Sequence, residues 1–131
     1  MPVRVELIDE AVEDLARYAR GGNLPLFLKK LLRLEEVGRD AGLPLGASLT
    51  GWRKMVAGDR NWRIIFTTDP NDTVATVWVI GDRDDSECYE DAERRVRILG
   101  RTKPEAQSLA AVLFQLNELR RTERRSRRRR R

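Results

Sequence analysis

The sequence contains no histidine and only one cysteine among its 131 residues. Histidine is the most frequent general base and the commonest metal ligand in proteins, so its absence removes many kinds of catalytic site. Cys88 alone cannot form an internal disulfide, and we therefore expect a cytoplasmic protein. Any chemistry must use arginine, lysine, tyrosine or carboxylates, and we expect no cofactor and no metal.

Long apolar segments are also missing. No stretch approaches the roughly 20 apolar residues that cross a bilayer. The N-terminal run MPVRVELIDEAVEDL is interrupted by acids where a signal peptide would need a continuous apolar region. We therefore expect no membrane partner. A chain of this length provides one domain with a modest core.

Charge is distributed unevenly along the chain. The net charge is +5, but residues 120–131 hold nine arginines and one acid, so that segment carries +8 and the rest −3. Such a run repels itself, and we expect it to be disordered. Its simplest role is a salt-dependent attraction to nucleic-acid phosphates.

Hydrophobic periodicity predicts an α+β fold. Alternating apolar residues at positions 3–8 predict a half-buried strand, and two segments with helical spacing follow, separated by Gly21-Gly22. The period then changes to 2, which predicts three consecutive strands at about Trp52–Ala57, Asn61–Thr68 and Thr73–Ile80. We therefore expect an antiparallel β-sheet, made of the N-terminal strand plus a three-stranded meander, packed by an N-terminal helix pair and C-terminal helices.

The C-terminal third predicts two further helices and then the arginine tail. One helix is expected over Ser86–Arg97, and Thr102-Lys103-Pro104-Glu105 is a capping-box sequence that opens another. The expected organisation is a main domain at 1–100, an additional amphipathic helix at 101–120 and the disordered tail at 121–131. The apolar stripe of the last helix is expected to pack on the protein itself; the alternative is an apolar face for a partner. Its members are Leu109, Val112, Leu113, Leu116 and Leu119.

The three strand segments place basic side chains and a tyrosine at fixed positions. They run LTGWRKMV, WRIIF and VATVWVIGDRDDSECY. Arginine suits the binding of a phosphate, because its planar fork grips two oxygens and keeps its charge. Tyrosine transfers protons effectively only where nearby cations favour its phenolate. Arg63 alternates with apolar neighbours on both sides, so the pattern leaves open which face of the sheet carries it.

The order of elements and these motifs resemble the RelE/ParE superfamily of toxins from toxin–antitoxin systems. The resemblance covers about Val3 to Val96, and three pieces carry it. They are Leu49-Thr50-Gly51-Trp52-Arg53, Trp62-Arg63-Ile64-Ile65-Phe66, and Val79-Ile80-Gly81-Asp82-Arg83 followed by Tyr89.

This resemblance implies a toxin that cuts messenger RNA in the ribosomal decoding site, through attack of the ribose 2′-OH on the adjacent phosphate. Arg63 and Arg83 would then hold the scissile phosphate, and Tyr89 would act in proton transfer. Arg53 or Lys54 would provide the basic position on the preceding strand, with Arg60 as a further substrate-binding residue. The implied partners are a cognate antitoxin protein, messenger RNA and the ribosome.

Two other functions remain open at this point. A ParE-like protein would inhibit DNA gyrase by binding, without catalysis, and the acids near Arg83 and Tyr89 favour this alternative. A member without toxicity would bind nucleic acid or protein through the tail and the last helix. The acids concerned are Asp82, Asp84, Asp85, Glu87, Glu90, Asp91 and Glu93.

Overall fold

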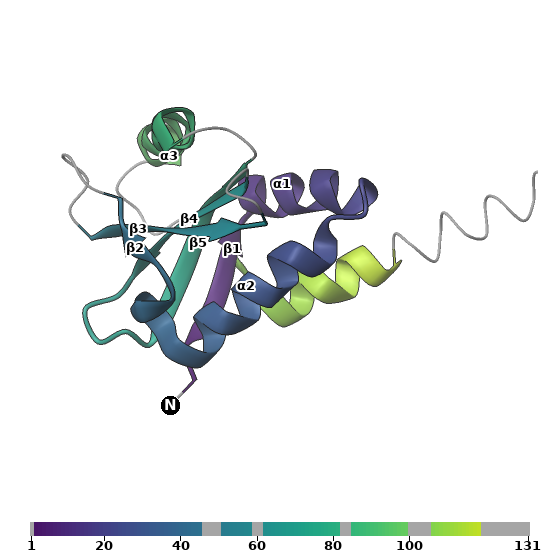
Figure 1. Cartoon of the computed structure of the whole chain (residues 1–131), viewed down its shortest axis with the longest axis horizontal. Helices are drawn as coiled ribbons and strands as arrows, with labels where there is room; N and C mark the ends of the chain where they lie inside the picture. Colours follow the sequence, from purple (N-terminus) through teal and green to yellow (C-terminus); the bar gives the residue numbers. More distant parts are fainter. Residues whose placement is uncertain (1, 46–50, 59–61, 82–84, 100–105, 119–131) are drawn as a thin grey trace, which may run out of the picture.

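The computed structural model of the chain describes residues 2–45, 51–58, 62–81, 85–99 and 106–118 (Figure 1). The elements are β1 (Arg4–Ile8), α1 (Asp9–Arg20), α2 (Leu24–Val37), the 3-10 helix η1 (Gly38–Ala41), β2 (Leu43–Pro44), β3 (Trp52–Ala57), β4 (Trp62–Thr68), β5 (Val74–Gly81), α3 (Asp85–Leu99) and β6 (Ala106–Ser108). Residues 109–118 are also helical. None of the helices in the described ranges is long and apolar enough to cross a membrane. The predicted helix pair and three-stranded meander are confirmed.

The strands form one six-stranded sheet in the order β2-β3-β4-β5-β1-β6. All neighbouring strands are antiparallel except β1 and β5, which run parallel with Arg4 opposite Val74 and Leu7 opposite Val77. The prediction of an antiparallel sheet is therefore confirmed apart from this one pair. Because β1 lies inside the sheet, its residues from 5 to 8 are all buried, whereas the sequence predicted a half-buried strand.

The C-terminal part adds an edge strand before its helix. β6 pairs with β1, and the helix follows at once, with the Ser108 hydroxyl accepting a hydrogen bond from the Ala111 N–H at 3.3 Å. The capping-box sequence at 102–105 lies outside the described ranges. Leu109, Val112 and Leu116 are buried in the common core, so the described part of the apolar stripe packs on the protein itself, as expected. Leu119 lies outside the described ranges.

The two faces of the sheet carry different elements. Trp62 of β4 packs against Tyr18 of α1 and Phe27 of α2, with ring centroids 4.8 and 5.3 Å away. Helix α3 contacts β4 and β5 and lies on the other side of the sheet from α2 (Figure 1). Side chains alternate along a strand, so Arg63 and Ile65 point to the side that α3 occupies, here called the α3 face. The structure thus assigns a face to Arg63, which the sequence pattern could not.

The turn between β4 and β5 is fastened to η1. The Asp72 carboxylate accepts the Arg39 backbone N–H at 3.0 and 3.2 Å, and Arg39 Nη2 donates to the Pro70 carbonyl at 2.9 Å. Gly38 allows this approach, because it has a φ of +67° and a Cβ there would lie 2.4 Å from an Asp72 oxygen. The sequence predicted the turn, and the structure adds its anchor.

Candidate functional site

Lys54 and Arg63 lie on neighbouring strands and share the α3 face. In the register of β3 and β4, Lys54 is opposite Ile65 and Val56 is opposite Arg63. Both basic side chains are half-buried, and Arg63 Nη1 makes a long contact of 3.4 Å with the Trp62 carbonyl. Since neighbouring strands are only about 4.8 Å apart, two such side chains can reach one phosphate.

Arg53 points to the opposite face. It is paired with the fully buried Phe66, and its Nη1 donates to the Gly42 carbonyl at 3.0 Å. The guanidinium therefore holds the chain after η1, on the side of the sheet away from Arg63. Of the two residues proposed for the basic position on β3, Lys54 shares a face with Arg63 and Arg53 does not. Arg60 lies outside the described ranges.

The end of β5 reaches the same region. Gly81 is paired with Arg63, and Arg83 follows two residues later in a segment that the structure does not describe. Tyr89 is half-buried in α3, directly after the fully buried Cys88. The structure therefore places Lys54 and Arg63 on the face of the sheet that also carries α3, the helix of Tyr89. Convergence with Arg83 remains a prediction.

The chain resembles known proteins in its fold rather than in its sequence. No family model matches the sequence, and no curated protein matches it either. Among solved structures, the E. coli toxin RelE as a double arginine-to-alanine mutant in the free state is similar, with a TM-score of 0.59 and 20% identity over 73% of this chain and 99% of that chain. One chain of the RelBE2 toxin–antitoxin complex from Mycobacterium tuberculosis has a TM-score of 0.52 and 20% identity. The match covers 63% of this chain and 100% of that chain. The chain has the fold of the RelE toxins.

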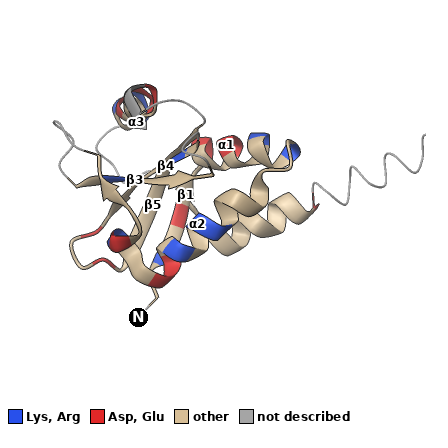
Figure 2. Ribbon diagram, in the orientation of Figure 1, with Lys and Arg blue, Asp and Glu red and all other residues tan. Residues whose placement is uncertain are grey.

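On this RelE fold, α3 presents charges of both signs beside the candidate site. Glu87, Glu90 and Glu93 are exposed, and Asp91 is paired with Arg94 at 3.0 Å. Helix α3 carries both acidic and basic residues (Figure 2), but the acidic ones come first and Arg94, Arg95 and Arg97 follow towards its C-terminal end. The charged residues within one turn of Tyr89 on α3 are therefore acidic, as the sequence indicated. The predicted acids Asp82 and Asp84 lie in the part that is not described.

A buried ion pair beside the site was missed by reasoning from sequence. Arg95 of α3 grips Asp14 of α1 through two hydrogen bonds of 2.7 and 3.2 Å, and its Nε lies 2.8 Å from Glu10 without hydrogen-bond geometry. Burial alone would lower the pKa of Arg95, but the hydrogen bond and charge of Asp14, with the charge of Glu10, raise that pKa above its usual value. A sequence signal existed, because both residues occupy buried positions of amphipathic helices.

Two cavities flank the RelE-like sheet. The smaller, about 180 Å³, lies at the end of β5 and is lined by α1, α3 and Gly81. The larger, about 360 Å³, opens over β1, β4 and β5 and includes the indole of Trp78. The described residues contain no group of three or more His, Cys, Asp or Glu side chains that could hold a metal ion.

Proposed function

We propose that this protein is the toxin of a toxin–antitoxin module and that it cleaves messenger RNA. The RelE fold supports the toxin assignment. The observation that carries the nuclease assignment is the strand register, which sets Lys54 and Arg63 on one face and pairs Arg63 with the end of β5. In this proposal the two basic side chains bind the scissile phosphodiester.

The chemistry follows from the residue types available. The ribose 2′-oxygen attacks the neighbouring phosphorus and the bond to the 5′-oxygen breaks, which leaves a 2′,3′-cyclic phosphate and a 5′-hydroxyl. Tyr89 takes part in moving the proton from the 2′-OH to the departing 5′-oxygen, so that no net proton is gained or lost. Arg63, Arg83 and Lys54 neutralise charge on the five-coordinate phosphorus, and each preorganised donor of this kind contributes about 3–4 kcal/mol.

The partners in this proposal are an antitoxin and the ribosome. Two of the similar solved structures are a toxin–antitoxin complex and a RelE mutant bound to a peptide of the antitoxin RelBc. We propose that a cognate antitoxin neutralises this protein in the cytoplasm, and that the ribosome presents the messenger RNA. The arginine tail adds a nonspecific attraction to nucleic acid.

The test expresses the wild type, Arg63→Ala and Arg83→Ala in cells and maps the 5′ ends of transcripts. The wild type should create new 5′ ends. In each variant the abundance of these ends should fall at least tenfold, since one charged donor is removed. Arg33→Ala is the matched control, because Arg33 is exposed on α2 and pairs only loosely with Glu36 at 3.7 Å. Unchanged cleavage in Arg63→Ala refutes its role. Intact transcripts together with DNA breaks would point instead to gyrase.

A further inference from the structure

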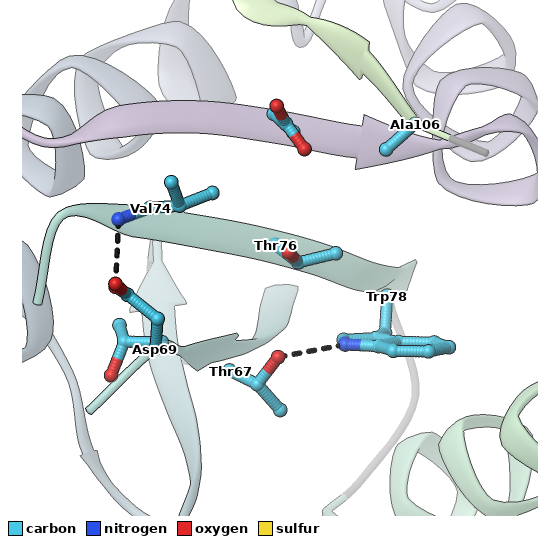
Figure 3. A pocket seen from close by; sticks show the side chains of 8 residues that line it. Thr67, Asp69, Val74, Thr76, Trp78 and Ala106 are labelled. Carbon is cyan, nitrogen blue, oxygen red and sulfur yellow. Dashed lines mark hydrogen bonds between the residues drawn. The ribbon is translucent and has the colours of Figure 1, made fainter. Parts of the chain in front are cut away.

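The larger cavity combines an aromatic wall with a buried carboxylate. Trp78 and Thr76 come from β5, Thr67 from β4 and Ala106 from β6 (Figure 3). The Thr67 hydroxyl accepts a hydrogen bond of 3.0 Å from the indole Nε1–H of Trp78. This bond fixes the orientation of the indole ring. The cavity therefore has a rigid apolar wall.

Glu6 provides a fixed hydrogen-bond acceptor in the same cavity. It belongs to β1, is only 8% exposed, and forms an ion pair with the exposed Arg4. A carboxylate accepts hydrogen bonds and does not donate them. A ligand that enters must therefore present an N–H or O–H group to Glu6 and a flat apolar surface to Trp78.

The cavity lies on the same face of the sheet as Lys54 and Arg63. Thr67 follows Arg63 by four residues on β4 and points to the same side, so the two lie roughly 13 Å apart along the strand. That distance is about four nucleotides of a stacked strand, and fewer of an extended one. Trp52, whose ring centroid is 5.3 Å from that of Trp78, extends the aromatic surface towards Lys54.

We propose that this cavity is a subsite for one unpaired base of the RNA strand, and that Glu6 selects a base with an amino group over uracil. The proposal rests on the proposed function, because it places the strand on the α3 face. Aromatic side chains stack on single-stranded bases, and carboxylates accept from the amino group of cytosine. Uracil has no amino group, and its one imide N–H, at N3, lies between two carbonyl oxygens that the Glu6 carboxylate repels.

A nucleobase fits this cavity better than a basic side chain from a protein. Glu6 already has the guanidinium of Arg4 as its counter-ion. The Asp69 carboxylate at the rim already accepts hydrogen bonds from Thr73 and from the Val74 N–H (Figure 3). A second cation would meet Arg4, whereas a neutral amino group would meet only the acceptor.

The test uses trinucleotides that cannot be cleaved, with 2′-O-methyl groups and a central adenine, cytosine, uracil or abasic site between two uridines. Binding to the full chain is followed by the indole N–H resonance of Trp78. Adenine and cytosine should bind about tenfold more tightly than uracil, as expected for a hydrogen bond to a charged group. In Glu6→Gln this preference should disappear, since the amide can donate to a uracil carbonyl.

Two further variants keep the result interpretable. Glu36→Gln removes one carboxylate from the surface of α2 and should leave the preference unchanged. Ala106→Leu fills the cavity from the edge strand. It should lower the affinity of each base-containing trinucleotide to that of the abasic one. Thermal unfolding of each variant establishes that it is folded.

The outcomes separate this proposal from the nuclease assignment. If cleavage depends on Arg63 but all four trinucleotides bind equally, or none shifts Trp78, the base subsite is refuted alone. If the base preference depends on Glu6 while Arg63→Ala cleaves normally, the nuclease site is refuted and the subsite stands. If Glu6→Gln weakens antitoxin binding and preserves the base preference, the cavity binds a basic side chain of that partner and the proposal is wrong.

Discussion

Asp14 and Arg95, which are 81 residues apart in sequence, form an ion pair that replaces a strand at the open edge of β5. β1 pairs with β5 only as far as Val77. Beyond that point the Asp14 carboxylate accepts the Ile80 N–H at 3.0 Å, and Arg95 Nη1 donates to the Trp78 carbonyl at 2.7 Å. The pair satisfies backbone groups that a neighbouring strand would otherwise satisfy. It also joins α1, β5 and α3 next to the candidate site.

Replacing Arg95 by methionine should therefore be strongly destabilising. The substitution leaves the buried Asp14 carboxylate with only the exposed Arg17, 3.7 Å away, as a counter-ion, and it removes the donor to Trp78. Loss of one partner from a buried pair costs about 3–5 kcal/mol, much of it for the uncompensated charge. Urea unfolding of Arg95→Met should show a loss of that size in the free energy of unfolding.

The neighbouring Arg94 gives a matched control for this prediction. Its side chain is 60% exposed and pairs with Asp91 at 3.0 Å on the same helix. Exposed pairs contribute about 0–1 kcal/mol, so Arg94→Met should change the free energy of unfolding by no more than that. Similar losses in the two variants would show that the buried pair has no special role.

Asp69 should make stability depend on pH in the acidic range. The Thr73 side chain and the Val74 N–H donate to its carboxylate and lower its pKa from 3.8 to about 2. A carboxyl with a depressed folded-state pKa stabilises the fold above its unfolded value, and this contribution is lost as the pH falls towards about 2. The stability difference between wild type and Asp69→Asn should thus be constant above about pH 5 and shrink below it. Urea titrations at several pH values measure it, and a difference independent of pH would contradict the assignment.

Much of the fold was predictable because local patterns were strong. Periodic apolar residues located α1, α2 and the meander, and the turn residues between β4 and β5 separated two strands. The parallel pairing of β1 with β5 was not predictable, because it depends on how distant segments dock and not on any local pattern. The same holds for β6, whose three residues carry too little periodicity to indicate a strand.

The candidate site was predictable in residue type but not in geometry. The sequence indicated basic residues at Arg53, Lys54 and Arg63, yet both faces of β4 carry apolar side chains, so alternation alone could not orient them. A register shift between β4 and β5 leaves Trp78 without a partner on β4, because Ile65 is opposite Val79 and Phe66 is opposite Val77. No sequence pattern marks such a bulge, so the position of Trp78 beside the cavity could not be predicted.

Gly38→Ala should destabilise the fold through the turn anchor. At a φ of +67° an alanine is strained, and its Cβ would lie 2.4 Å from the Asp72 carboxylate that binds the Arg39 N–H. Backbone strain of this kind costs about 1–3 kcal/mol before any shift of Asp72 is counted. Gly22→Ala is the comparison, since Gly22 also has a positive φ of 83° but no atom within 4 Å of its Cβ position. Denaturant unfolding should show the larger loss for Gly38, and an equal loss would mean that Asp72 moves away freely.

The adjacent residues Arg53 and Lys54 provide the sharpest test of which face of the sheet is functional. Arg53→Met removes the hydrogen bond to Gly42 and should lower the free energy of unfolding by about 1 kcal/mol, while the folded protein cleaves RNA at the normal rate. Lys54→Met keeps the aliphatic stem but removes a charge from the α3 face, so cleavage should fall roughly tenfold or more. Cleavage rates corrected for the folded fraction separate the two effects. Greater loss of cleavage in Arg53→Met than in Lys54→Met would mean that the substrate does not bind on the α3 face.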